Sequence, residues 1–213
     1  MINKDTLIFC SFAKEAGNTG CMIFNKAFEL DKINALYKSF SVNNIKEAVN
    51  AARTLNFKGF AITMPYKKEI LKYVDVISDD AIAIGAANTV INDNGILKAY
   101  NTDFISAKEV LSENLKYNNL VILGNGGYAA SIRYAAKKLK LHYGTICREK
   151  WADIKNIKNS IVYNCTPVSD IVVDDSNFYI DSIVSTKMGK RLALIQAKYQ
   201  YKLYTGLDFP NNI

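Results

Sequence analysis

The chain has 213 residues, of which 49% are hydrophobic and 22% are charged, and its formal net charge is +7. This composition is typical of a globular protein and excludes a disordered or fibrous chain. The length fits one large domain or two small ones, and it is sufficient to bury a core without disulfides or a structural metal.

The counts of histidine and cysteine exclude several kinds of site. His142 is the only histidine, so a His-rich metal site is excluded, and a Ser-His-Asp or Cys-His site would depend on that residue alone. The four cysteines contain no Cys-x-x-Cys pair, which argues against a zinc ribbon. We therefore predict no metal and interpret the cysteines as reduced thiols of a cytoplasmic protein. The sequence contains no apolar run that predicts a signal peptide or a membrane span.

The positive charge is unevenly distributed along the chain. Residues 1–103 contain 12 basic and 11 acidic residues, whereas residues 104–213 contain 15 and 9. A nucleic-acid-binding protein usually has a dense basic run with interleaved aromatic residues, but the densest run here, at 137–140, resembles the end of an amphipathic helix. We expect no nucleic-acid partner, and a basic interaction protein is an alternative that no motif supports.

In the first half, hydrophobic periodicity and turn residues predict alternating strands and helices. The predicted strands cover residues 6–12, 35–42 and 59–64; the predicted helices cover 21–30 and 44–55, with a loop at 17–20 and a further helix that begins at Tyr66. Asp93-Asn94-Gly95 lies between two β-favouring runs, 89–92 and 96–100, and predicts a hairpin. Thr102 or Asp103 is the predicted cap of a helix that runs to about Asn114.

The second half repeats the order of strand and helix. The predicted strands cover residues 120–123, 143–147 and 160–163, and the predicted helices cover 129–139 and 192–204. This alternation indicates an α/β fold with a parallel sheet and helices on its faces.

A glycine-rich turn follows the strand that ends at Leu123. Gly124, Gly126 and Ala129 fill a G-x-G-x-x-A pattern, and Asn125, Gly127 and Tyr128 complete the turn. The first glycine allows the tight turn, the second lets backbone N–H groups approach a pyrophosphate, and the small third residue lets the helix pack on the strand. The pattern therefore predicts a dinucleotide site; an ordinary tight strand–helix turn is the alternative.

The next predicted strand ends at a charged segment. An NAD site usually has a carboxylate at this position and an NADP site a basic residue. Arg148 comes first and fits a 2′-phosphate, Glu149 follows it, and Lys150 can assist. A solvated charged loop is the alternative.

Lys67 and Asp103 each follow a predicted strand in the first half. A lysine at a helix start opposes the helix dipole, so helix propensity does not explain Lys67. An aspartate at a helix start is also a plain N-cap, which is the alternative for Asp103. A lysine and an aspartate that come together can shift each other's pKa and share a proton, so the pair is a candidate acid–base device.

Five motifs occur in an order that resembles the shikimate dehydrogenase family. They are Thr63-Met64-Pro65-Tyr66-Lys67, Gly85-Ala86-Ala87-Asn88-Thr89, Tyr100-Asn101-Thr102-Asp103, Gly124-Asn125-Gly126-Gly127 and Asn164-Cys165-Thr166-Pro167. Leu194-Ile195-Gln196-Ala197 followed by Tyr204-Thr205-Gly206 resembles the closing helix of the family. The resemblance spans most of the chain, from about Thr6 to Gly206.

The resemblance implies a two-domain protein. We expect an N-terminal α/β substrate domain at residues 1–103, to which 190–213 return, and a Rossmann-like dinucleotide-binding domain at 104–189. The stretch between Pro167 and Gln196 is shorter than is usual in the family. The second domain is therefore expected to be shortened by a strand or two.

The resemblance also implies an activity, the NADP-dependent, reversible reduction of 3-dehydroshikimate to shikimate in the biosynthesis of aromatic compounds. It makes Lys67 and Asp103 the catalytic pair and implies substrate-binding roles for Thr63, Asn88 and Gln196. It places NADP against the glycine turn, with Arg148 at the 2′-phosphate and Asn164 and Thr166 at the strand end beside the cofactor. The expected partner is a small-molecule substrate, and we expect a monomer or homodimer that binds no membrane.

One segment departs from the family. Asn18-Thr19-Gly20 occupies the place of a Ser-x-Ser pair that holds the substrate carboxylate, and Asn18 is the remaining donor. This departure resembles the divergent shikimate-dehydrogenase-like branch. It leaves two alternatives, a nucleotide-binding paralogue with weak or no shikimate activity and an enzyme for a quinate-type acid.

Overall fold

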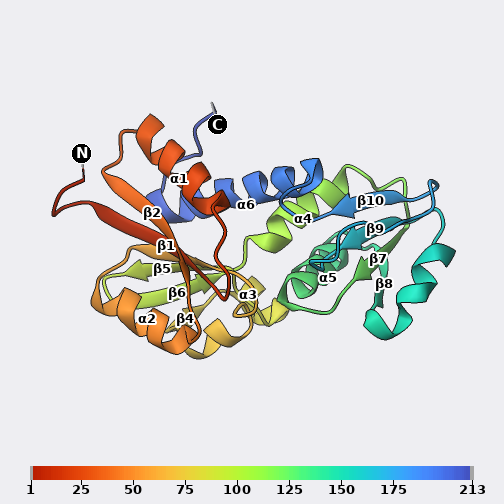
Figure 1. Ribbon diagram of the computed structural model, residues 1–213, viewed down its shortest axis with the longest axis horizontal. Coiled ribbons are helices and arrows are strands. Elements are labelled where there is room, and N and C mark those ends of the chain that lie inside the picture. The colour runs from red at the N-terminus through yellow and green to blue at the C-terminus, as the bar shows by residue number, and fades with distance from the viewer. Residues whose placement is uncertain (1, 212–213) are drawn as a thin grey trace. The chain divides into compact units, whose positions relative to one another are not determined.

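The computed structural model describes residues 2–211, which form two compact units (Figure 1). The first unit comprises the chain up to Thr102 together with the segment from Gln196 onward, and the second comprises Asp103–Ile195. The second unit includes residues 190–195, which the expected substrate domain contained, because Leu192 and Ile195 are buried in its core. Met1 and residues 212–213, which that expected domain also contained, lie outside the described residues.

A six-stranded mixed sheet forms the first unit. Its strands lie in the order β2, β1, β3, β5, β6, β4; the first three are parallel, β5 is antiparallel to β3, and β6 is antiparallel to β5. The strands are β1 (Leu7–Ala13), β2 (Ala35–Ser41), β3 (Gly59–Ile62), β4 (Val76–Ile77), β5 (Thr89–Asp93) and β6 (Ile96–Tyr100). The predicted parallel pairing is found for β2, β1 and β3, and the β5–β6 hairpin extends the sheet with antiparallel strands.

Helices cover both faces of this first sheet (Figure 1). On one face, α1 (Thr19–Leu30) and the part of α6 (Lys187–Thr205) that follows Gln196 bury an aromatic cluster, in which Phe24 stacks on Tyr37 with ring centroids 4.6 Å apart. On the other face, α2 (Ile45–Thr54) packs against the strands. Because side chains alternate along a strand, β1 contributes Phe9 to the first face and Cys10 to the second.

The sequence specifies α2 locally. The Asn44 side chain caps its first turn, since Oδ1 accepts from the backbone N–H groups of Lys46 and Glu47 at 3.0 and 3.3 Å. Ile45, Ala48, Val49 and Ala52 recur at helical spacing and are the buried residues of the helix. The predicted helix at 44–55 is thus confirmed within one residue at each end.

The predicted hairpin is also confirmed. Asn94 and Gly95 connect β5 to β6 with φ angles of 52° and 94°. A two-residue hairpin loop with both φ angles positive matches the twist of the strands, and Asn-Gly is the dipeptide that adopts it most readily.

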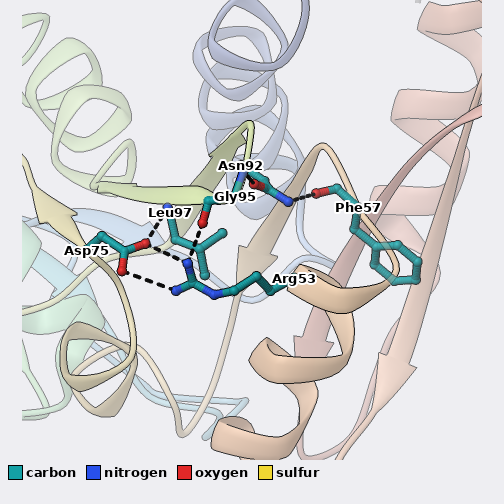
Figure 2. Close-up of polar contacts among 6 residues, drawn as sticks. All are labelled: Arg53, Phe57, Asp75, Asn92, Gly95 and Leu97. Atoms are coloured by element: carbon teal, nitrogen blue, oxygen red, sulfur yellow. Dashed lines mark hydrogen bonds and ion pairs between the residues drawn. The ribbon is translucent and has the colours of Figure 1, made fainter.

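Arg53 on α2 fixes this hairpin to the rest of the unit (Figure 2). Its guanidinium donates to both carboxylate oxygens of Asp75, at 2.8 and 3.3 Å, and to the carbonyl of Gly95. The same carboxylate accepts the backbone N–H of Leu97 at 2.7 Å. Arg53 and the Leu97 N–H hold the pKa of Asp75 below its ordinary value.

The second unit contains a four-stranded, entirely parallel sheet in the order β10, β9, β7, β8. The helix α4 (Asp103–Ser112), the helix α5 (Gly127–Lys138) and the first part of α6 cover one face, and the 3-10 segment η2 (Arg148–Asn156) covers the other. The strands are β7 (Asn119–Leu123), β8 (His142–Ile146), β9 (Ile161–Asn164) and β10 (Phe178–Asp181). The predicted α/β class is confirmed.

Several short segments differ from the predictions. Thr19 and Gly20 begin α1 and are not in a loop, and Lys67 lies in a turn before the four-residue 3-10 helix η1 (Glu69–Lys72), not in a helix. The sequence does not predict β4, β10 or α3 (Asp79–Ile84), which have two, four and six residues. The shortened stretch after Pro167 still supplies β10, which pairs with β9.

None of the helices in residues 2–211 combines the length and the apolar character that crossing a membrane requires.

We expect the contribution of Asp75 to stability to depend on pH. Because its pKa is lowered by folding, its contribution is present above the unfolded-state pKa of about 4 and is lost as the pH falls. At neutral pH, Asp75→Asn should lower the free energy of unfolding by about 1 kcal/mol, since the pair is partly exposed. Urea unfolding of both proteins across the acid range measures this difference.

The control is Asp153→Asn, which removes an exposed carboxylate that makes no ion pair among the described residues. Its effect should stay near zero throughout. If the difference in the free energy of unfolding between wild type and Asp75→Asn stays the same as the pH falls, the lowered pKa of Asp75 does not contribute to stability.

Candidate functional site

Four segments of the first unit meet at one edge of its sheet. The parallel strands β1 and β3 end at this edge, β5 begins there because it is antiparallel to β3, and β6 ends there. Asn18 follows β1, the Thr63–Lys67 loop follows β3, Asn88 precedes β5 and Thr102 follows β6. The topology thus brings the predicted residues Asn18, Thr63, Lys67 and Asn88 to a single sheet edge.

Backbone hydrogen bonds hold the Thr63–Lys67 loop against Asn88. The Ile62 N–H donates to the Asn88 carbonyl at 2.8 Å, and the Ala87 N–H donates to the Lys67 carbonyl at 2.8 Å. The buried Tyr66 anchors the loop on its other side, because its hydroxyl donates to the Val42 carbonyl at 2.6 Å. Lys67 and Thr63 are half-buried in this arrangement.

The side chain of Asn88 is fully buried and ties the start of β5 to the end of β6. Its Nδ2 donates to Thr102 Oγ1 at 2.9 Å, and its Oδ1 accepts the Thr102 N–H at 2.7 Å and the Thr89 hydroxyl at 3.0 Å. Asn101 Nδ2 adds a parallel bond to the Ala86 carbonyl at 2.9 Å. These amides fix the backbone that leads into Asp103.

The closing helix supplies two glutamines to this unit. Gln196 is half-buried and makes no hydrogen bond among the described residues. Gln200 is buried, and its Nε2 donates to Thr89 Oγ1 at 2.8 Å and to the Asn88 carbonyl at 3.2 Å. Thr89 and Thr102 belong to the motifs, but the sequence does not predict their bonds to Asn88. It assigns no role to Gln200, although a spacing of four residues places Gln200 on the same helix face as Gln196.

Asn18 lies at the start of α1 with an exposed side chain that makes no capping hydrogen bond. Two residues later, a Cβ at Gly20 would lie 2.8 Å from the ring of Tyr37. The buried Tyr37 ring therefore requires a residue without a side chain at this position.

The second unit gathers the remaining predicted residues at the edge where its parallel strands end. β7 leads into the glycine turn, β8 into Arg148, and β9 into the Asn164–Thr166 segment. Each unit has its own sheet and its own core.

Gly124 is the residue on which the shape of the turn depends. Its φ is 99°, its N–H donates to the Ile146 carbonyl at 2.9 Å, and a Cβ would lie 2.8 Å from Thr166 Cγ2. Both the left-handed conformation and the close approach require glycine. The hydrogen bond also brings the turn next to the end of β8, two residues before Arg148.

The turn opens onto the N-terminus of α5. No side chain caps this helix, and its first turn contains no acidic residue. Asn125 and Gly126 are exposed, and a Cβ at Gly126 would meet no atom within 4 Å. Ala129 is fully buried in the core, as the pattern predicts. Open space and a positive helix end fit a phosphate anion.

The side chain of Tyr128 points into the unit. Its hydroxyl lies 2.9 Å from the hydroxyl of Tyr163, which is fully buried. Burial raises the pKa of Tyr128 well above its ordinary value, and the neighbouring Cys165 and Asp103 raise it further. Tyr128 therefore stays neutral, and only its backbone faces the turn. Asp103 itself, the first residue of α4, is fully buried.

Arg148 is the first residue of η2 and is exposed. Its side chain makes no ion pair or hydrogen bond within the part of the chain that the structure describes. An exposed guanidinium beside the glycine turn has the charge and the freedom to bind a phosphate.

Asn164 and Thr166 build the loop after β9. The fully buried Asn164 accepts the N–H and the hydroxyl of Thr166 at 2.9 and 2.7 Å, and its Nδ2 donates to the Val168 carbonyl at 2.9 Å and to Asp181 at 3.2 Å. These bonds fix the conformation of the loop and occupy the side chains of Asn164 and Thr166 within it. Asp181, a partner that the sequence does not predict, comes from β10.

Among residues 2–211, no three His, Cys, Asp or Glu side chains are arranged to hold a metal ion.

Comparisons with known proteins give a consistent result. Residues 19–90 match the family model described as the shikimate dehydrogenase substrate binding domain. A shikimate dehydrogenase-like protein of Haemophilus influenzae is 36% identical over 149 residues, which are 67% of this chain and 55% of that protein. This chain thus spans about half the length of that relative.

Two further matches cover most of both chains. A protein of Caldanaerobacter subterraneus named shikimate dehydrogenase (NADP(+)) is 30% identical over 88% of this chain and 87% of its own length. The solved structure of a shikimate 5-dehydrogenase-like protein superposes with a TM-score of 0.83 and 25% identity, covering 99% of this chain and 96% of that one.

We expect Gly124→Ala to destabilise the protein by about 1–3 kcal/mol, because the added Cβ meets Thr166 and the φ of 99° strains alanine. The matched control is Gly144→Ala on β8, where a Cβ meets nothing within 4 Å and φ is not positive. It should change the free energy of unfolding by less than about 0.5 kcal/mol. Urea unfolding compares the two variants, and equal losses would argue against a special role for Gly124.

Proposed function

We propose that this chain, which belongs to the shikimate dehydrogenase family, is an NADP-dependent oxidoreductase that interconverts shikimate and 3-dehydroshikimate. The observation that carries the proposal is the sheet edge of the first unit. There, two backbone hydrogen bonds join the Lys67 loop to the segment of Asn88, within the region that the substrate binding domain model largely covers. This arrangement puts a cation and a buried amide beside each other, as a polyhydroxylated anionic substrate requires.

The second unit is the proposed cofactor domain. The uncapped N-terminus of α5 and the open space at Gly126 fit a pyrophosphate, and the exposed Arg148 fits a 2′-phosphate. Gly124, Asn125, Gly127 and the backbone of Tyr128 would complete the turn around it, with the Asn164–Thr166 loop beside it. When bound, NADPH supplies the hydride that reduces the ketone carbon. The name of the Caldanaerobacter relative supports NADP as the cofactor.

Lys67 is the proposed proton donor. As the carbonyl carbon gains a hydride, its oxygen gains negative charge, and the Lys67 ammonium transfers a proton to that oxygen. In the reverse direction the neutral amine accepts the hydroxyl proton. Asp103 is the proposed partner that holds the lysine in the correct charge state. Thr63, Asn88 and Gln196 would orient the ring hydroxyls, and Asn18 would donate to the carboxylate.

One observation favours a second candidate function. Gly20 cannot carry a side chain without displacing the Tyr37 ring, so only Asn18 remains to hold a carboxylate by its side chain at this position. This favours weak binding of the carboxylate, and the choice between shikimate and a quinate-type acid then depends on the other side chains at the edge. Steady-state assays with shikimate and quinate, followed by NADPH absorbance, test both. NADPH binding without turnover of either acid would favour the non-catalytic paralogue.

We expect Lys67→Ala to lower kcat by about 100-fold or more while KM for the acid changes less than about threefold, because the proton transfer occurs in the transition state. The matched control is Lys68→Ala, which removes the neighbouring exposed cation from the same turn. It should keep kcat within about twofold. A loss in Lys67→Ala that appears equally in a binding titration would argue against the acid–base role.

We expect Arg148→Ala to reduce the ratio of kcat/KM for NADP to that for NAD by about tenfold, because the bond to the 2′-phosphate exists only with NADP. Lys155→Ala, which removes an exposed cation near the other end of η2, is the control and should leave the ratio unchanged. An unchanged ratio in Arg148→Ala would remove this residue from the cofactor site.

A further inference from the structure

Gln200 is an amide placed in the apolar face of a helix. It is 2% exposed and lies between the buried Ala197 and Tyr201 of the aromatic cluster of the first unit. Burying an amide costs free energy unless its polar atoms are hydrogen-bonded. Its Nε2 therefore donates twice, to Thr89 Oγ1 at 2.8 Å and to the Asn88 carbonyl at 3.2 Å.

These bonds set the direction of a hydrogen-bond relay. An amide nitrogen can only donate, so Thr89 Oγ1 accepts from Gln200 and has a single proton left to donate. That proton goes to Asn88 Oδ1 at 3.0 Å, and the Thr102 N–H reaches the same oxygen at 2.7 Å. Two donors thus identify this side of the Asn88 amide as its oxygen. The Nδ2 group must then face Thr102 Oγ1, where it donates at 2.9 Å.

The same contact also positions Gln196. Residues four apart lie above one another on the same face of an α-helix. Because Gln200 is fixed to the beginning of β5, the face of α6 one turn earlier lies toward the same sheet edge. Gln200 therefore acts on two of the side chains proposed to meet the substrate, Asn88 through Thr89 and Gln196 through the helix.

We propose that Gln200 is a positioning residue for the substrate hydroxyls, which sets the orientation of the Asn88 amide and seats Gln196 without contacting the substrate itself. This inference rests on the proposed function, since it assumes that a polyhydroxylated acid binds at this edge. It concerns substrate recognition and not the chemical step, so the expected effect is on KM for the acid.

The test is Gln200→Met, which keeps the length of the side chain but removes the donor. We expect KM for shikimate to rise about tenfold, kcat to stay within about threefold, and KM for NADP to stay unchanged. The control Lys198→Met introduces methionine on the exposed face of α6 and should leave kcat and both KM values unchanged. If Gln200→Met does not fold, Thr89→Val removes the relay hydroxyl at nearly constant shape. It should likewise raise KM for shikimate and leave kcat nearly unchanged.

A second readout does not depend on turnover. The Thr102 N–H donates to Asn88 Oδ1, so loosening the Asn88 amide should speed its hydrogen exchange about tenfold in Gln200→Met at equal global stability. Unchanged exchange would overturn the positioning role, and so would faster exchange with an unchanged KM for the acid. A wild-type protein that turns over neither shikimate nor quinate would contradict the proposed function instead, and the exchange measurement would still decide whether Gln200 sets the amide.

Discussion

The first unit depends on one buried amide more than on any other polar group. Asn88 lies where three strands reach the same edge of the sheet, and its side chain bonds to both the backbone and the side chain of Thr102. Its own carbonyl accepts from Ile62, the last residue of β3. Without these bonds, the ends of β3, β5 and β6 would depend on their strand pairing and on the bonds of Ala87 to Lys67 and of Asn101 to Ala86. The segment that enters Asp103 would then lose its main attachment to the start of β5.

The second unit uses the same device. Asn164 is also fully buried at a strand end. Its side-chain oxygen and nitrogen both form hydrogen bonds with the following loop, and the nitrogen also bonds to Asp181 on the neighbouring strand β10. In both units, the motif asparagine also holds its own fold together. A buried amide suits this task because it offers two donors and an acceptor in a fixed plane, and a buried polar group that is fully bonded rigidifies its surroundings. The asparagines therefore shape the edges from which exposed groups, such as Arg148, can act.

Much of this arrangement could be predicted from the sequence, and the reason is local. Asn-Gly specifies the hairpin, Asn44 specifies the start of α2, and G-x-G-x-x-A specifies the turn after β7, because each depends on the conformation of a few neighbouring residues. Features that depend on distant contacts could not be predicted. β10 is a strand because β9 offers it an edge, and Lys67 is in a turn and not a helix because its carbonyl accepts from Ala87.

Gln200 shows most clearly which features cannot be predicted from the sequence. Within its helix, the segment Lys198-Tyr199-Gln200-Tyr201-Lys202 offers no reason to separate this amide from the exposed polar residues around it. Helical spacing assigns it to the face of Gln196 but cannot say that Thr89 lies opposite, because the two residues are 111 positions apart. The pairing follows only from the return of the chain after Gln196 to the first unit. A closing helix that returns to the first sheet thus does more than cover apolar surface. It delivers a donor to the sheet edge at which the residues proposed to bind the substrate lie, and so links the last helix of the chain to the proposed site of its first half.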